Sequence, residues 1–168
     1  MLGIDLSNPE SSKAALKKWI VSIHDFVKTL FLRLGSDFEI QAKRHISAYV
    51  RSARSGKFSP DSYGDSQASV SETISSDVKT NFGFPLIVVG CKSDILDSDD
   101  ASTVKENREF QGYLRHFCHQ FGAALVYTSA VNDNNCLKLR KYIMHRLYPE
   151  TVQMDLELSV NPNLNNYC

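Results

Sequence analysis

The sequence lacks an excess of charge of either sign. Its 168 residues include 19 basic and 19 acidic side chains, so the formal net charge at pH 7 is zero. Nucleic-acid binders attract phosphate backbones through clustered positive charge, and this balance therefore argues against a nucleic-acid partner. No apolar run approaches the roughly 20 residues that cross a bilayer, and the start of the chain has no basic segment followed by an apolar core. We expect a soluble, intracellular protein without membrane insertion.

Paired cysteines are also missing. The four cysteines lie far apart and form no C-x-x-C pair: Cys91, Cys118, Cys136 and Cys168. This spacing indicates neither a disulfide framework nor a structural zinc site, so we expect reduced thiols. His116, Cys118 and His119 share one predicted helix, but Cys118 belongs to its apolar stripe. The arrangement therefore favours a core thiol beside surface histidines, and we expect no metal site.

Three apolar runs predict β-strands that alternate with helices. They are Leu2–Leu6, Phe84–Gly90 and Ala123–Thr128, and the second is typical of a strand buried on both faces of a parallel sheet. Apolar spacings of three and four predict helices over about 11–34, 36–53, 102–121 and from 136 to a stop at Pro149. Ser11 or Ser12 is expected to cap the first helix. This order predicts an α/β fold with a parallel sheet of three core strands and flanking helices.

Serine dominates one segment of the chain. It occupies nine of the 25 positions between residues 52 and 76, where bulky apolar side chains are sparse. Such a composition cannot offset the entropy lost on ordering, so we predict a flexible serine-rich insertion over 53–83 within a single α/β domain of residues 1–149. The tail, 150–168, begins by alternating apolar and polar residues, which predicts an extended edge strand or a docked segment.

Candidate binding residues follow two of the predicted strands. Ligands of open α/β sheets bind at the carboxyl ends of the strands, where this chain has Lys92 and Asp94, and then Ser129 and Ala130. The order resembles the guanine-recognition loops of Ras-like GTPases. An aspartate can accept the N1 and N2 protons of guanine, a lysine stem can lie over the base, and the Ser-Ala backbone can meet the base carbonyl. Cys91 stands where asparagine is usual, so the amide that ties the loop to the base is missing.

A phosphate-binding loop is absent from the sequence. No G-x-x-x-x-G-K-[ST] occurs, although most nucleotide affinity in this fold comes from such a loop with its lysine and magnesium. No Ser/His/Asp or Cys/His arrangement suggests a nucleophile either. We therefore expect no catalytic residue and no cofactor. The other interpretation of Lys92 and Asp94 is a solvated loop in which Asp94 caps a turn.

The sequence resembles the cytoplasmic dynein light intermediate chains. Three stretches carry the resemblance: Ile4–Ser7 with Pro9 and Leu16–Trp19, then Leu86–Asp94, and the longest, Tyr113–Ser129 with Lys141–Ile143 and Leu147–Tyr148. It spans most of residues 2–148. It does not extend to the first third of the family's GTPase-like domain, or to the long C-terminal arm that engages cargo adaptors.

The resemblance implies a fold and a role. The fold would be a partial, N-terminally truncated GTPase-like domain with a Ras-like sheet and degenerate nucleotide motifs. The role would be that of a non-catalytic subunit that packs on the dynein heavy chain tail, beside other dynein subunits. It would support motor assembly and cargo linkage in microtubule-based transport in the cytoplasm. The alternative is a small GTPase or nucleotide-binding domain whose phosphate-binding loop lies upstream of this sequence.

Overall fold

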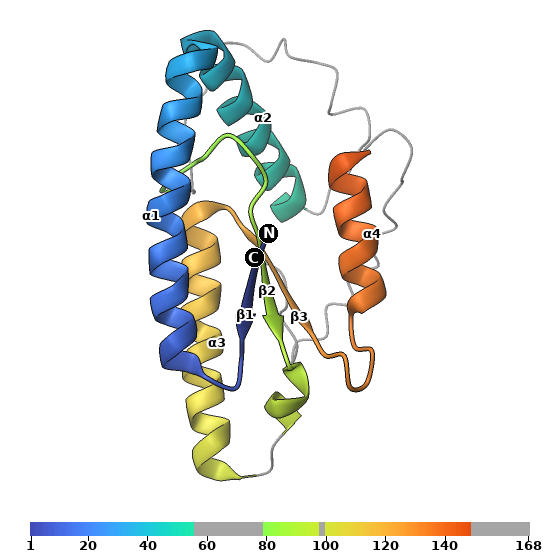
Figure 1. Cartoon of the computed structure of the whole chain (residues 1–168). Helices are drawn as coiled ribbons and strands as arrows, with labels where there is room; N and C mark the ends of the chain where they lie inside the picture. The colour runs from blue at the N-terminus through green and yellow to red at the C-terminus, as the bar shows by residue number, and fades with distance from the viewer. Residues whose placement is uncertain (56–78, 98–99, 149–168) are drawn as a thin grey trace.

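The chain forms a parallel β-sheet between helices in a computed structural model that describes residues 1–55, 79–97 and 100–148 (Figure 1). The elements in chain order are β1 (Leu2–Asp5), α1 (Pro9–Leu34), α2 (Ser36–Ser55), β2 (Ile87–Cys91), the short 3-10 helix η2 (Ser93–Asp97), α3 (Ala101–Phe121), β3 (Ala124–Thr128) and α4 (Cys136–Leu147). The predicted α/β class is therefore confirmed.

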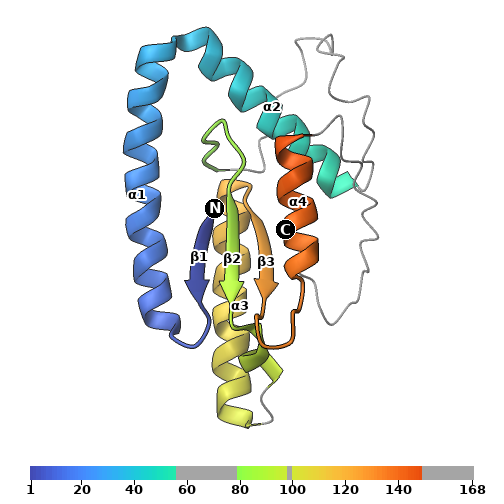
Figure 2. The ribbon, with the colours of Figure 1, turned by 45° about the vertical axis from the view of Figure 1, so that its right-hand side comes forward.

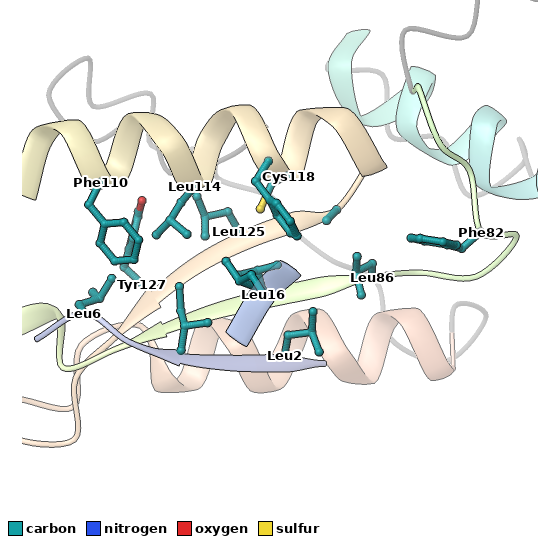
Figure 3. Close-up of a cluster of buried hydrophobic side chains, with 14 of the residues drawn as sticks. Leu2, Leu6, Leu16, Phe82, Leu86, Phe110, Leu114, Cys118, Leu125 and Tyr127 are labelled. Carbon is teal, nitrogen blue, oxygen red and sulfur yellow. The ribbon is translucent and has the colours of Figure 1, made fainter. Parts of the chain in front are cut away.

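The sheet has the strand order β1-β2-β3, and all its pairs are parallel. Val88 lies at its centre, opposite Leu2 on β1 and Leu125 on β3. Each strand reaches the next through a crossover that contains helices, as parallel pairing requires. Helices α1 and α3 lie against one face of the sheet, and α4 lies against the other (Figures 2 and 3). The three-stranded arrangement is that of a partial Ras-like core.

The main core fills the space between the sheet and helices α1 and α3. Leu16, Val88 and Leu114 are fully buried there, and Leu125 is 1% exposed. Figure 3 shows Leu16, Leu114 and Leu125 converging between α3 and the strands. Burying one such side chain contributes about 1.5–3 kcal/mol. The core therefore fixes the strand ends from which the candidate site is built.

The first helix begins earlier than the predicted caps. Asn8 is the capping residue, and its side-chain oxygen accepts a hydrogen bond from the amide of Ser11 at 3.1 Å, while Pro9 takes the first helical position. The cap predicted at Ser11 or Ser12 is wrong, because Ser12 donates from Oγ to the carbonyl of Asp5 at 2.7 Å. That bond ties the first turn of α1 to the end of β1.

Both described ends of the segment 53–83 belong to the folded body. Helix α2 continues to Ser55. At the other end Phe82 is 4% exposed and stacks on Phe121, with ring centroids 5.6 Å apart. Asn81 donates from Nδ2 to the carbonyl of Lys43 at 2.8 Å. Residues 53–55 and 79–83 of the predicted insertion are therefore ordered. Its middle, 56–78, lies outside the described residues together with the predicted tail, 150–168.

Candidate functional site

The carboxyl ends of the three strands form one row. Asp5 of β1 pairs with Cys91 of β2, and Cys91 pairs with Thr128 of β3. The chain leaves the sheet directly after each of these residues, so the predicted site residues lie along a single edge (Figure 2). The parallel register therefore places Lys92 and Ser129 one residue beyond this row.

Lys92 turns toward β1. Its backbone has a φ of 63°, in the left-handed region that residues other than glycine seldom adopt. Its ammonium donates to Asp5 Oδ2 at 2.6 Å and to Ser7 Oγ at 3.2 Å. The half-exposed lysine thus closes an ion pair between the loops that follow β1 and β2.

Asp5 is the acceptor at the centre of this group. Besides Lys92, its Oδ1 accepts from the amide of Ser7 at 2.9 Å and from the Ser7 hydroxyl at 2.6 Å. The bond from Lys92, followed by the two from Ser7, lowers the pKa of Asp5 from 3.8 to about 2. The carboxylate is therefore ionised at neutral pH, with partners on both oxygens.

Asp94 and Ser129 form a second group. The Ser129 hydroxyl donates to Asp94 Oδ1 at 2.5 Å, and Ser129 Oγ accepts from the amide of Val131 at 3.2 Å. Ser129 is 1% exposed, so this bond to a carboxylate is shielded from water on the serine side. Asn135 donates to the carbonyl of Tyr127 at 2.9 Å and holds the same loop against β3.

The four predicted site residues therefore divide between two groups. Lys92 joins Asp5 and Ser7, whereas Asp94 joins Ser129, and Ala130 lies exposed in the following turn. Sequence patterns identified the positions but not their partners. The Lys92 pair with Asp5 follows from parallel register, which the sequence does not determine.

This arrangement limits what the edge can bind. A guanine base would have to compete with Ser129 for Asp94 Oδ1 and with Asp5 for the Lys92 ammonium. Cys91 is exposed and offers a thiol in place of an amide. Among the described residues, no three His, Cys, Asp or Glu side chains are grouped for a metal ion. Over the same residues, none of the helices has the length and apolar character needed to span a bilayer.

Comparison with known sequences assigns the chain to a family. The sequence model of the dynein light intermediate chain (DLIC) family matches residues 1–156. The chain belongs to the DLIC family. This match confirms the resemblance carried by the three stretches of sequence described above.

Curated relatives agree with this membership. The chain is 30% identical over 159 residues to cytoplasmic dynein 1 light intermediate chain 1 of Gallus gallus and to that of Homo sapiens, alignments that cover 88% of the chain. It is 39% identical over 71 residues to the Dictyostelium discoideum protein of the same name, which covers 40% of the chain. The chain spans 31% of the Gallus gallus protein and 30% of the human protein, so it corresponds to about a third of these DLIC relatives.

Proposed function

We propose that this DLIC-family chain is a non-catalytic subunit of cytoplasmic dynein. In this role it packs on the dynein heavy chain tail, contacts other dynein subunits, and supports motor assembly and cargo linkage in microtubule-based transport in the cytoplasm. The observation that carries the proposal is the family match across residues 1–156. Lys92 and Asp94 already have partners within the protein, which supports weak nucleotide binding at most.

Exposed aromatic side chains on α1 form a surface on which the heavy chain tail could pack. Trp19 is 56% exposed and Phe26 is 65% exposed, and they lie seven residues apart, on the same side of the helix. Aromatic residues are enriched at the centres of protein interfaces, where they supply much of the binding energy. We therefore place the heavy chain contact on this side of α1.

Co-purification with a heavy chain tail fragment tests the proposal. We expect the two chains to elute together, and we expect Trp19→Ala with Phe26→Ala to lose the fragment. Val21→Ala is the matched control, because Val21 is 61% exposed on a different side of α1. A wild-type chain that elutes apart from the fragment would contradict heavy chain packing.

The alternative function is nucleotide binding. It is favoured by one observation, the placement of Lys92, Asp94 and Ser129 along the carboxyl edge of the sheet. Calorimetric titration with GDP and with GTP in magnesium separates the two functions. A non-catalytic subunit is expected to give weak binding at most and no hydrolysis, whereas a micromolar or tighter dissociation constant would support the alternative.

A further inference from the structure

The outward side of α4 is both apolar and cationic. Four large apolar residues there are exposed: Leu137 by 65%, Met144 by 38%, Leu147 by 64% and Tyr148 by 54%. Arg140 and Lys141 lie among them and are also exposed. Spacings of three, four and seven residues put the five that belong to α4 on one side of the helix, and Tyr148 follows directly after its end. We call this set the α4 outer face.

The surroundings of this face add positive charge and no negative charge. Neither 134–148 nor 40–55, which ends α2, contains Asp or Glu. The two segments together carry Arg44, Arg51, Lys138, Arg140, Lys141 and Arg146, besides Lys43, whose ammonium pairs with Glu39. Helices α2 and α4 meet where the Arg146 guanidinium lies over the Tyr49 ring, 3.4 Å from its centroid (Figure 2). The face therefore continues into a positively charged junction.

Arg146 brings a positive charge without a hydrogen-bond acceptor to this junction, as far as the structure describes the chain. Its Nε and Nη1 are buried and have no hydrogen-bond partner within the described ranges. Burial, and then the charge of Arg146, lower the pKa of the neighbouring His45. The Tyr49 ring is the contact that the structure gives this half-buried guanidinium, and a ring face does not neutralise its charge, so the junction stays positively charged.

The sequence that follows α4 has the complementary composition. Residues 150–158 contain Glu150, Asp155 and Glu157, while 159–168 contain no charged side chain. Apolar residues alternate through the same stretch as Val152, Met154, Leu156 and Leu158. Only Pro149 separates this stretch from Tyr148, so the local concentration of its carboxylates around α4 is high.

We propose that the acidic segment 150–158 binds the α4 outer face within the same molecule. Asp155 and Glu157 pair with Arg140 and Lys141 of this face and with the neighbouring Lys138. The proposal does not depend on the dynein role proposed above.

Zero-length cross-linking of the full chain tests this contact directly. A carbodiimide couples an amine to a carboxylate that already touches it. We expect linked peptides that join Lys138 or Lys141 to Asp155 or Glu157 in the monomer. A mixture of 15N-labelled and unlabelled chains identifies links between molecules. Links that join two copies, links from Asp155 and Glu157 to other lysines alone, or no links would each overturn the proposal.

Charge exchange provides an independent readout. Chymotrypsin cleaves after Leu156 and Leu158, and its specificity does not depend on lysine or glutamate. We expect Lys138→Glu with Lys141→Glu to accelerate this cleavage by up to about fivefold per lost ion pair. Asp155→Lys with Glu157→Lys should do the same, and the four changes together should restore the slow rate.

The control for charge exchange is Lys17→Glu with Lys18→Glu, an equal change on exposed positions of α1. This variant is expected to be cleaved like the wild type. Equal acceleration in this control, or no restoration in the fourfold variant, would overturn the proposal.

Sedimentation with phosphatidylserine vesicles tests whether the α4 outer face binds an acidic membrane surface instead. Suppose that Lys138→Glu with Lys141→Glu abolishes vesicle binding but leaves the rate of chymotrypsin cleavage after Leu156 and Leu158 unchanged. That result would overturn the proposal and assign the face to membranes instead.

Discussion

Ser129 donates its hydroxyl proton to Asp94, and this 2.5 Å bond joins the loop after β3 to the loop after β2. Both residues belong to the loops whose sequence resembles the guanine-recognition loops of Ras-like GTPases. Here they face one another, and the buried serine satisfies one carboxylate oxygen. The pair therefore stabilises the edge of the sheet.

Removal of this bond should destabilise the chain measurably. We expect Ser129→Ala to lower the free energy of unfolding by about 1.5–3 kcal/mol, because a hydrogen bond to a charged acceptor is lost. Urea denaturation followed by circular dichroism measures the change. Ser102→Ala is the control, since its Oγ also donates to a carboxylate, that of Asp100, but at an exposed position. Equal losses in both variants would contradict a special role for the buried bond.

The main core should respond strongly to a cavity. Leu114 is fully buried between α3 and the sheet, so we expect Leu114→Ala to cost about 2–5 kcal/mol in unfolding free energy. The matched control is Leu32→Ala on α1, where the side chain is 79% exposed and the expected change is within about 0.5 kcal/mol. Similar losses at both sites in urea denaturation would contradict the packing described here.

Two glycines should give opposite results when replaced by alanine. At Gly90 the added methyl carbon would lie 2.8 Å from Cδ1 of Tyr127, so we expect a loss of about 1–3 kcal/mol. At Gly112, in the interior of α3, nothing lies within 4 Å, and we expect a gain of about 0.5–1 kcal/mol from higher helix propensity. Thermal unfolding compares both variants with the wild type. A destabilising Gly112→Ala would show that α3 is packed differently at this position.

The ion pair between Lys92 and Asp5 should make stability depend on pH in acid. The folded pKa of Asp5 is about 2, below its value of about 3.9 in an unfolded chain. The stabilisation is therefore complete above pH ~4 and is lost as the pH falls toward 2. Asp5→Asn lacks this contribution at every pH. We therefore expect the wild type to have the higher urea midpoint at neutral pH, and the difference between the two midpoints to shrink as the pH falls from ~4 toward 2. A constant difference between pH 6 and pH 2 would contradict the assignment.

The sequence predicted the fold better than the partners of the site residues. Apolar periodicity located all three strands and the four long helices, because burial imposes that periodicity directly. Gly122 ends α3 with a φ of 62°, as a glycine terminator should. The N-cap was placed at Ser11 or Ser12, although Asn8, three residues before Ser11, has an equally suitable side chain, and only the position of β1 selects between them.

The site was harder because its partners come from distant parts of the chain. Lys92 lies 87 residues from Asp5, and Ser129 lies 35 residues from Asp94. Residue types and spacing identify a loop after a strand, but they do not show whether its side chains point to a ligand or to a neighbouring loop. The stacking of Arg146 on Tyr49 left no signal in the sequence for the same reason.

The parallel register also has a consequence for the order of folding. Ile87 of β2 pairs with Ala124 of β3, and the connection between these strands consists of η2 and α3. Leu2 of β1 pairs with Val88 of β2, and the connection between them is longer, because it contains α1, α2 and the residues between α2 and β2. Closing the longer stretch costs more chain entropy before any contact repays it. The unit from β2 to β3 is therefore expected to form first, and β1 to join an already folded strand.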